Sequence, residues 1–584
     1  MADSGAMLSP TRRWAPVPAP PVSPELSDAA ERHGVPPRVL RLLAARGCER
    51  PEDLEAFVAE PLSVLHDPAL LPDAAVVAER LARARAHGER VLVYGDFDAD
   101  GLTALSVMVL ALRHHGLEVE PYVPSRFTDG HGLSEGAVDR AAAAGCSVIV
   151  TVDCGSSSAD EIALAARRGI DVLVTDHHHV PERWPGSAAV VNPQRADNRY
   201  PDTRLTGAGV AFKVAQLLLG GRDGGDSGWT GLADLAAIGT ISDVAPLLGE
   251  NRAIVRLGLD LLRERPRPGL AALLEVAGVA PARVDADVVA YTIAPRLNAA
   301  GRIGEVTLAS RLLMSSDREE AAGLAAQLEE ANRTRRDLTA SALAEARAVV
   351  GDPGDAPALV IAGPWPAGLI GLVAGRLAEE HRRPAVVFST QLEPWRGSGR
   401  SPTGALDLAR AFAACGRHFV RYGGHPEAAG GDLLPGSLEP FREEFLALAA
   451  AGPLEHREPD LRVDLSVPVA EVGYDLHRDL ARLEPFGPGN PPPQVAVLGA
   501  TVTRIRPVSN GHVQLTVSKG REVLDVIAFG RADLGAQVAP GDRLDLVARI
   551  GSRHFGGYES LQLELLDAAS AGHGLPSAAG TPGR

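Results

Sequence analysis

The segment Val91–Gly101, VLVYGDFDADG, constrains the fold of this chain most strongly. A run of β-branched and aliphatic residues ends abruptly in three carboxylates at alternate positions, Asp96, Asp98 and Asp100. Alternate residues share one face of a strand, whereas in a loop beyond the strand they can converge on one point. Carboxylates so close repel one another unless a cation compensates. The simplest interpretation is a divalent metal ion held by oxygen ligands where a buried strand ends.

Two further strand-like segments repeat this design. Ser147–Val152 is followed by Asp153–Gly155, and Asp171–Thr175 is followed by the triplet Asp176–His178. In an open α/β sheet, ligands bind beyond the carboxyl ends of the strands. Three successive strand ends that carry acids or imidazoles therefore predict a metal-dependent hydrolase.

Each piece also has an ordinary structural alternative. An acidic loop after a strand is typical of a helix N-cap, and Asp100 could cap a helix that starts near Leu102. The pair His114 and His115 lies on an ordinary helix face and is interpreted as structural. The recurrence of metal-type residues at three strand ends favours the metal site.

The chain predicts an α/β fold with more than one domain. From about residue 75 to 280, short aliphatic runs alternate with alanine-rich helical patterns, which indicates a parallel sheet with crossover helices. Leu324–Val350 contains neither Gly nor Pro and predicts a helix of about 40 Å that joins two lobes. A second α/β lobe starts at Pro357–Ile361. Five short strands between Val495 and Asp567 predict an OB-type barrel, a common single-strand binder.

Composition agrees with a multidomain enzyme. The chain has 584 residues, of which 45% are hydrophobic, enough for several cores. Its four cysteines have no CxxC spacing, so neither a zinc ribbon nor a disulfide framework is indicated. No segment has the apolar character of a signal peptide or membrane span, and we expect a cytoplasmic protein with no membrane contact.

The net charge of −16 argues against broad, non-specific duplex binding but leaves room for a local basic groove. A clustered set of arginines is also typical of a solvated helix face. We therefore consider substrate contacts only for clusters inside the motifs below. The arginine clusters are Arg333, Arg335 and Arg336; Arg396 and Arg400; Arg417 and Arg421; and Arg504 and Arg506.

The Asp-His-His triplet and its upstream Asp-x-Asp-x-Asp strand end resemble the DHH phosphoesterase superfamily. Within it, the chain is similar to the bacterial RecJ family of single-strand-specific exonucleases, from about Ala75 to Asp567. The resemblance is carried, in order, by GDFDADGLTA (Gly95–Ala104), PSRFTDGHGLS (Pro124–Ser134), TVDCG (Thr151–Gly155), TDHH (Thr175–His178), VNPQ (Val191–Gln194), LTGAGVAFK (Leu205–Lys213), AAIGTISDVAPLLGENR (Ala236–Arg252), PRLNAAGRIG (Pro295–Gly304), GSGRS (Gly397–Ser401), YGGHPEAAGG (Tyr422–Gly431) and PFGPGNPPP (Pro485–Pro493).

This resemblance implies a domain order. A parallel-sheet DHH domain is joined by a long helix to a smaller α/β DHH-associated domain, and an OB-type β-barrel follows. The expected segments are a disordered tail over 1–35, the DHH domain with N-terminal helices over 36–305, the connecting helix over 306–352, the DHH-associated domain over 353–455, the OB-fold nucleic-acid-binding domain over 456–568 and a disordered tail over 569–584.

The resemblance also implies a site with two divalent metal ions. Carboxylates with an imidazole favour Mn²⁺, with Mg²⁺ as the alternative. Asp153 is the candidate for the bridging ligand. The metal ligands it implies are Asp98, Asp100, Asp153, His177 and Asp243, and the catalytic residues beside them are Asp96 and Asp176, which orient ligands, and His178, which faces the scissile phosphate or the leaving oxygen.

Matching positions imply a pocket for the 5′ end of the strand. Arg126, Ser398 and Arg400 would bind the terminal phosphate, although ordinary loop capping is the alternative for these residues, and His425 would line the same cleft. The last three candidates, which either contact the strand or lock their helix into the core, are Arg296, Asn298 and Arg302. Where related enzymes often read Trp-His-x-Gly, this chain has Trp365–Gly368 with a proline in place of the histidine, so that segment is not assigned to the site.

The function implied is a 5′→3′ exonuclease specific for single-stranded DNA that releases 5′-mononucleotides in repair and recombination. The expected partners of this monomeric enzyme are single-stranded DNA, a single-strand DNA-binding protein and a RecQ-type helicase. Two alternatives remain open: another DHH phosphodiesterase that acts on oligonucleotides or cyclic dinucleotides, and a non-catalytic DNA-binding scaffold.

Overall fold

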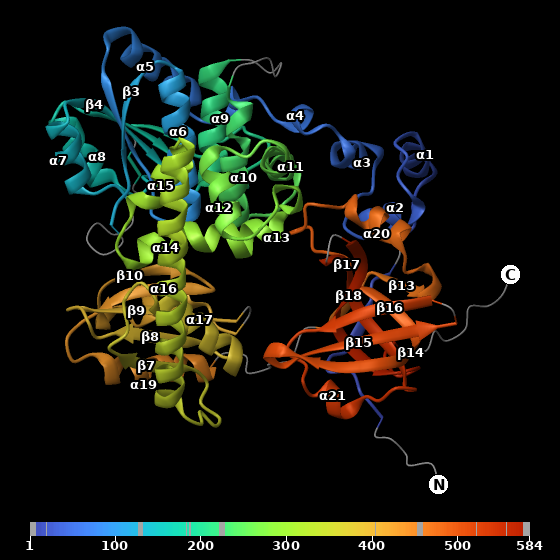
Figure 1. Cartoon of the computed structure of the whole chain (residues 1–584). Coiled ribbons are helices and arrows are strands. Elements are labelled where there is room, and N and C mark those ends of the chain that lie inside the picture. Colours follow the sequence, from blue (N-terminus) through green and yellow to red (C-terminus); the bar gives the residue numbers. More distant parts are fainter. Residues whose placement is uncertain are drawn as a thin grey trace. The chain divides into compact units, whose positions relative to one another are not determined.

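The computed structural model describes residues 7–18, 20–125, 132–182, 184–185, 188–220, 228–402, 405–451, 460–520, 522–555 and 558–575. The chain divides into two compact units (Figure 1). The larger unit comprises Leu65–Pro246 and Glu250–His456. The barrel unit comprises Met1–Val64, Leu247–Gly249 and Arg457–Arg584.

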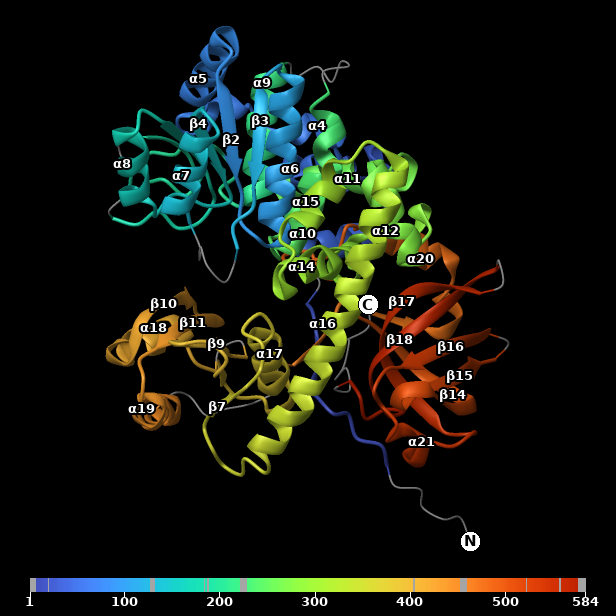
Figure 2. The same ribbon diagram turned by 60° about the vertical axis from the view of Figure 1, so that its left-hand side comes forward.

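The larger unit begins with a parallel sheet in the strand order β3-β2-β4-β5-β6. Val91–Tyr94 of β2 are fully buried, as expected for a central parallel strand with both faces covered. Helices α7 and α8 cover one face, and α6 and α9 cover the other (Figures 1 and 2). The predicted α/β architecture is therefore confirmed, and the segments that follow β2, β4 and β5 share one edge. The strands are β2 (Arg90–Tyr94), β3 (Glu118–Tyr122), β4 (Cys146–Val152), β5 (Asp171–Thr175) and β6 (Ala189–Val191).

Helices make up the rest of this first lobe. They are α5 (Ala74–His87), α6 (Ala99–His114), α7 (Glu135–Ala143), α8 (Ala159–Arg167), α9 (Gly207–Leu219), α10 (Ala233–Ser242), α11 (Gly249–Glu264), α12 (Pro268–Val276), α13 (Ala286–Val288), α14 (Ala294–Ile303) and α15 (Thr307–Met314).

A single long helix, α16 (Arg318–Val350), leads to the second lobe. It starts before Leu324, where the sequence pattern predicts its start, because the side chain of Asp317 caps it by accepting the Glu320 N–H at 2.7 Å. Its 33 residues span about 50 Å. The first half buries leucines such as Leu328, and the second half packs through Ala342 into the core of the second lobe.

The second lobe contains a mixed sheet in the order β10-β11-β9-β8-β7. Only β7 and β8 are parallel, and the other neighbours are antiparallel. A phenylalanine cluster that includes Phe388, Phe412 and Phe441 fills one side of it. The elements are β7 (Leu359–Gly363), α17 (Ile370–His381), β8 (Ala385–Ser389), β9 (Trp395–Arg400), α18 (Leu408–Ala414), β10 (Phe419–His425), β11 (Ala428–Leu433) and α19 (Leu438–Ala451).

In the barrel unit, five strands form a closed barrel, because β14 pairs with both β15 and β17. The prediction of an OB-type barrel from five short strands is confirmed. The elements of this C-terminal region are β12 (Leu461–Val463), β13 (Leu465–Pro468), α20 (Tyr474–Ala481), β14 (Val495–Val508), β15 (His512–Lys519), β16 (Glu522–Ala528), α21 (Leu534–Gln537), β17 (Arg543–Phe555) and β18 (Tyr558–Ser570).

The N-terminal segment belongs to this unit and differs from the expected disordered tail over 1–35. Trp14–Pro16 pairs in parallel with Leu461–Val463, and the Trp14 side chain is 2% exposed. The helices that follow share their core with the barrel strands, so residues 36–64 also belong here rather than to the DHH domain. Trp14 packs on residues from 461 onward, so the sequence around it offers no nearby partner and its composition alone predicts disorder. The elements are β1 (Trp14–Pro16), α1 (Pro24–Arg32), α2 (Pro37–Ala44), α3 (Pro51–Val58) and α4 (Pro61–Val64).

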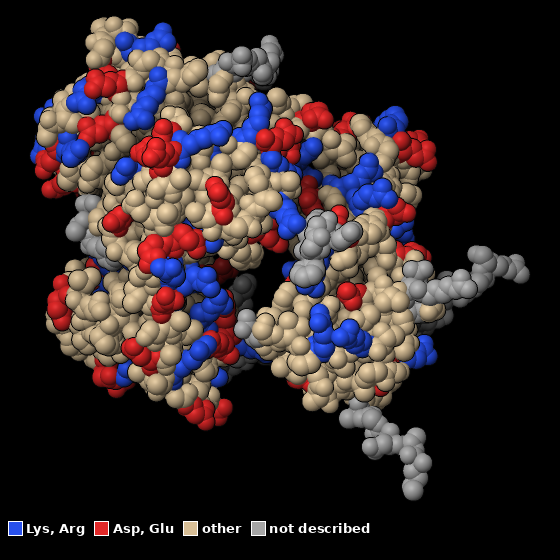
Figure 3. Space-filling view, in the orientation of Figure 1, with Lys and Arg blue, Asp and Glu red and all other residues tan. Residues whose placement is uncertain are grey.

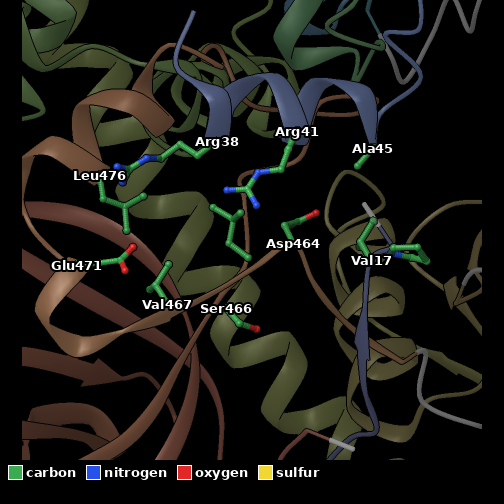
Figure 4. Close-up of a pocket in the computed structure, with 11 residues that line it drawn as sticks. Val17, Arg38, Arg41, Ala45, Asp464, Ser466, Val467, Glu471 and Leu476 are labelled. Carbon is green, nitrogen blue, oxygen red and sulfur yellow. The ribbon is translucent and has the colours of Figure 1, made fainter. Parts of the chain in front are cut away.

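A cavity of about 280 Å³ lies in the barrel unit between α2 and β13. Figure 4 shows Arg38 and Arg41 extending from α2. Arg38 forms an ion pair with Asp479, with 3.1 Å between Nε and Oδ2. The described residues that line this cavity include no histidine or cysteine, so the cavity lacks the mixed ligand set predicted for the metal site.

Among the helices in the described ranges, none has both the length and the apolar character needed to cross a bilayer. The longest, α16, is rich in charged residues.

The buried carboxylate of Asp567 generates a stability prediction. It accepts hydrogen bonds from the Thr11 N–H (3.0 Å) and the Trp14 Nε1–H (2.8 Å). Asp567→Ala should lower the free energy of unfolding of the barrel unit by about 3 kcal/mol, because buried donors lose their acceptor. Urea denaturation followed by tryptophan fluorescence measures this. Asp460→Ala removes an exposed partner of Arg13 and should change it by less than about 1 kcal/mol; equal effects would contradict the assignment.

Candidate active site

The loop between β2 and α6 places the first carboxylates. Asp98, not Asp100, is the N-cap of α6, and its side chain accepts the Gly101 N–H at 3.0 Å. The alternative in which Asp100 caps the helix is therefore wrong, because the helix begins one turn earlier, at Ala99. Asp100 lies inside the first turn and is 2% exposed.

Asp100 is held by the N-terminus of another helix. The Gly207 N–H donates to its Oδ2 at 2.7 Å, and the Ala208 N–H donates to its Oδ1 at 2.9 Å. The first turn of α9 thus stabilises a buried carboxylate, since helix N-termini favour negative charge. The sequence motif LTGAGVAFK contains these donors, but no side chain in it signals this role.

Asp153 adopts a strained backbone conformation at the end of β4. Its φ is 61°, a left-handed value that costs free energy for a residue with a side chain. Its N–H donates to the Thr175 carbonyl at 2.9 Å, so the turn is fixed to the neighbouring strand. A Cβ at Gly207 would overlap the Asp153 side chain, which explains a glycine at that helix start.

The Asp-His-His loop is organised around Asp176. This carboxylate accepts the N–H groups of Ser156 (3.0 Å) and His177 (2.8 Å) and the Nδ1 of His178 (2.8 Å). Burial would raise the pKa of Asp176, but these hydrogen bonds lower it below its ordinary value. The hydrogen bond between Asp176 and the His178 ring raises the pKa of His178 to about 9. Asp176 therefore stays ionised and keeps the His178 ring oriented and protonated near neutral pH.

Asn192 also stabilises the Asp-His-His loop, a role that the sequence analysis does not predict. Its side-chain amide donates to the Ser156 Oγ at 3.0 Å and to the His178 carbonyl at 2.9 Å. It is fully buried, so the VNPQ motif fixes the path of the loop through this side chain. The match to the VNPQ motif is the sequence feature that could have indicated this role.

The atoms at the centre of the cluster are buried and have no hydrogen bond. Asp153 Oδ1 and His177 Nε2 lie 3.0 Å apart, yet neither has a hydrogen-bond partner. The His177 Nε2 is also 3.8 Å from Asp100 Oδ2, and its Nδ1 is 4.0 Å from Asp243 Oδ2. Orphaned polar atoms of this kind are costly in a protein interior, and a shared cation would satisfy them.

Electrostatics point to the same conclusion. Burial, and then the negative charges of Asp100 and Asp98, raise the pKa of Asp153 well above its ordinary value. The same causes raise the pKa of Asp243 to about 8. Burial lowers the pKa of His177, which favours the neutral imidazole that binds metal. Divalent cations would reverse the cost of ionising the two acids.

Three overlapping groups of side chains could each hold an ion. Asp153 and His177 each belong to two of them, which fits a bridging position for Asp153. Asp96 and His178, placed outside the predicted ligand set, each join one group. The groups, whose ligand atoms lie within 4.8 Å of one another, are Asp153, His177 and His178; Asp100, His177 and Asp243; and Asp96, Asp98 and Asp153.

The second lobe brings polar side chains to a helix N-terminus. Ser398 and Arg400 are two positions apart on β9 and so share one face of the strand. The Arg400 Nη1 donates to the Ser398 Oγ at 3.0 Å. A Cβ at Gly371, in the first turn of α17, would lie 3.0 Å from the Arg400 Nη2 and 3.1 Å from the Ser398 Oγ. The predicted partner Arg126 lies outside the described residues.

The other residues predicted to contact the strand have different surroundings. Arg296 bonds Glu329 of α16 (Nε to Oε2 2.6 Å), and Arg302 donates to the Gly368 carbonyl of the second lobe at 3.1 Å, so both join elements together. Asn298 is half-buried, and no hydrogen bond of its side chain is seen in the described parts of the chain. His425 is exposed at the end of β10 and lies close enough to His177 to contribute to the lowering of its pKa.

A parallel sheet whose strand ends converge on aspartates and an Asp-His-His loop defines a DHH-type phosphoesterase. Three family descriptions match the chain: the DHH family N-terminal domain over residues 90–240, the DHHA1 domain over 356–451 and the RecJ OB domain over 463–567.

Curated relatives agree with this class. The single-stranded-DNA-specific exonuclease RecJ of Bacillus subtilis is 34% identical over 94% of this chain and 70% of the relative, and that of Dickeya dadantii is 34% identical over 93% and 97%. The crystal structure of RecJ from Thermus thermophilus in complex with Mn²⁺ is 30% identical, with a TM-score of 0.80 over 95% of this chain and 79% of that chain. The chain belongs to the RecJ family of single-stranded-DNA-specific exonucleases.

The close approach of α10 to Asp100 generates a test of the site. A Cβ at Gly239 would overlap the Asp100 Oδ1 and the Thr103 Oγ1, so Gly239→Ala should displace the carboxylate. We expect Mn²⁺ affinity, measured by calorimetry, to fall at least tenfold, about 1.4 kcal/mol.

The matched control is Gly323→Ala in α16, where an added Cβ meets no described atom within 4 Å. This variant should keep full affinity, because alanine is favourable in a helix. Unchanged affinity in Gly239→Ala would show that the approach of α10 does not fix Asp100.

Proposed function

We propose that this chain is a metal-dependent exodeoxyribonuclease that degrades single-stranded DNA from the 5′ end and releases 5′-mononucleotides. The observation that carries the proposal is the buried, unsatisfied pair Asp153 Oδ1 and His177 Nε2 at the centre of an acidic cluster in a RecJ-family chain. Relatives of this family are named single-stranded-DNA-specific exonucleases.

Two divalent ions would be held by five side chains, with Asp153 shared between them. The mixture of carboxylates and one imidazole favours Mn²⁺, with Mg²⁺ as the alternative. One crystal structure of the Thermus thermophilus relative is in complex with Mn²⁺ and another is in complex with Mg²⁺. When bound, the ions supply a water of lowered pKa and neutralise charge on the reacting phosphate. The proposed ligands are Asp98, Asp100, Asp153, His177 and Asp243.

His178 would act on the phosphate itself. Its Nδ1 is bonded to Asp176, so the Nε2 is left to face substrate. The hydrogen bond to Asp176 raises the pKa of the ring, which favours a proton on Nε2. That N–H can donate to an oxygen of the scissile phosphate or assist the leaving oxygen. Asp176 and Asp96 would position these groups.

Polarity would follow from capture of the 5′ end. The Ser398 hydroxyl, the Arg400 guanidinium and the first turn of α17 together form a cradle suited to an anion, since helix N-termini and arginine forks both favour phosphate. His425 would line the same cleft, and Arg126 is added by resemblance alone. Stacking and electrostatic binding in the OB-type barrel would favour unpaired strands over duplex.

The proposal includes the cellular context that the family resemblance implies. The enzyme would act in the cytoplasm, in DNA repair and recombination, on strands unwound by a RecQ-type helicase and covered by a single-strand DNA-binding protein.

Digestion of a single-stranded oligonucleotide with Mn²⁺ tests the reaction. Labels placed at either end should show stepwise release of mononucleotides from the 5′ end, and a blunt duplex should be spared. Asp153→Ala should lower the rate at least a thousandfold, because both ions lose a ligand. Retention of more than about a tenth of the rate would refute the bridging assignment, and cleavage of dinucleotides only would place the chain among other DHH phosphodiesterases.

Arg400→Ala tests the 5′ pocket. It should lower kcat/KM on 5′-phosphorylated strands about tenfold more than on 5′-hydroxyl strands, because only the former lose a charged contact. The control Arg410→Ala removes an arginine of the same lobe whose side chain is 90% exposed, and it should leave both substrates unaffected. An equal loss on both kinds of end would argue against phosphate capture by Arg400.

A further inference from the structure

The middle of α16, residues 333–341, is a waist between the two lobes of the larger unit. On its N-terminal side Leu328 and Ala331 are buried, and on its C-terminal side Ala342 and Ala346 are buried, whereas no side chain of the waist itself is buried. The waist carries three arginines within four positions, a cluster that the proposed function leaves unexplained. Figure 3 shows basic side chains gathered over the middle of this helix.

Arg335 is the most unusual of these residues. Its Nη2 donates to the Asn332 Oδ1 at 2.9 Å, but its Nε is buried and has no hydrogen-bond partner. Burial, followed by the positive charges of Arg336 and Arg296, lowers the pKa of Arg335. A half-buried guanidinium with one buried, unsatisfied N–H beside like charges costs free energy unless an anion approaches.

Two neighbouring carboxylates already have partners. Glu329 pairs with Arg296 (2.6 Å), and Glu330 pairs with Arg333. Within the described residues, neither Arg335 nor Arg336 forms an ion pair. The waist contains one carboxylate, Asp337, against three arginines, so an excess of positive charge remains.

Helix α14 relates this cluster to the metal site. Arg296, near its start, lies close enough to contribute its charge to Arg335. Further along the same helix, a Cβ at Gly301 would lie 3.4 Å from the carbonyl oxygen of Phe97, which stands between the acids Asp96 and Asp98. Five residues of a helix span about 8 Å, so the waist lies within the reach of a strand whose scissile phosphate is at the metal site.

We propose that Arg335 and Arg336 bind a backbone phosphate of the single strand on the 3′ side of the scissile bond. A phosphate oxygen would accept an N–H of the partly exposed Arg335 guanidinium, and the exposed guanidinium of Arg336 would add a charged contact. This inference rests on the proposed function, since the ligand is the polymeric substrate of the same site.

The test compares long and short substrates. In Arg335→Gln/Arg336→Gln, the Kd of a 3′-labelled DNA 12-mer, measured by fluorescence anisotropy in EDTA, should rise about tenfold. The slope of log Kd against log salt should decrease by about 0.7 for each lost phosphate contact. Hydrolysis of a trinucleotide with Mn²⁺ should be affected much less than binding of the 12-mer, because the trinucleotide has only one phosphate beyond the scissile bond.

Two variants keep the test decisive. Arg336→Gln alone changes an exposed side chain, so its effect cannot arise from misfolding. Arg376→Gln removes an exposed arginine that pairs with Glu379 on α17 and should leave the Kd unchanged. If the 12-mer Kd and its salt slope match the wild type while the wild type degrades DNA, the waist site is wrong and the proposed function stands. If the wild type neither binds nor degrades DNA, the proposed function fails, and the inference fails with it.

Discussion

The whole arrangement depends on holding several carboxylates close together in a buried place. Asp100, Asp153 and Asp176 are each almost fully buried, and like charges so near would drive protonation or unfolding. Asp176 is stabilised by N–H donors and His178, and Asp100 is stabilised by the first turn of α9. Asp153 receives no such donor at Oδ1. Its ionised carboxylate is therefore stabilised only when cations are bound.

Strained backbone conformations occur where the chain positions these carboxylates. Among the described non-glycine residues, left-handed φ values are rare, and two of them fall at the cluster: Asp153 at 61° and Val244, next to Asp243, at 59°. A β-branched residue resists this conformation most. Such strain persists only where the surroundings over-determine it. Here the strand pairing around Asp153 and the packing of α10 hold both acids toward His177.

The sequence predicts this centre well because its acids follow strand ends, where a two-residue alternation and a parallel sheet suffice to bring them together. It predicts less well whatever depends on distant chain segments. The donors to Asp100 come 107 residues later and are backbone amides, which no side-chain pattern reveals. The N-terminal residues around Trp14 look disordered because the acceptor that fixes them, Asp567, lies 553 residues away.

The second lobe shows how a rigid helix can couple two kinds of chemistry. The lobe that binds cations and the lobe that carries Ser398 and Arg400 share α16, and the hydrogen bond from Arg302 to Gly368 ties them a second time. A helix spanning a gap must expose its middle to solvent, and an exposed middle is commonly neutralised by paired charges. In α16, Arg333 pairs with Glu330 and Arg347 pairs with Glu380, whereas Arg335 and Arg336 between them form no ion pair among the described residues. These two guanidiniums are better explained by a polyanion that passes between the lobes than by helix stability.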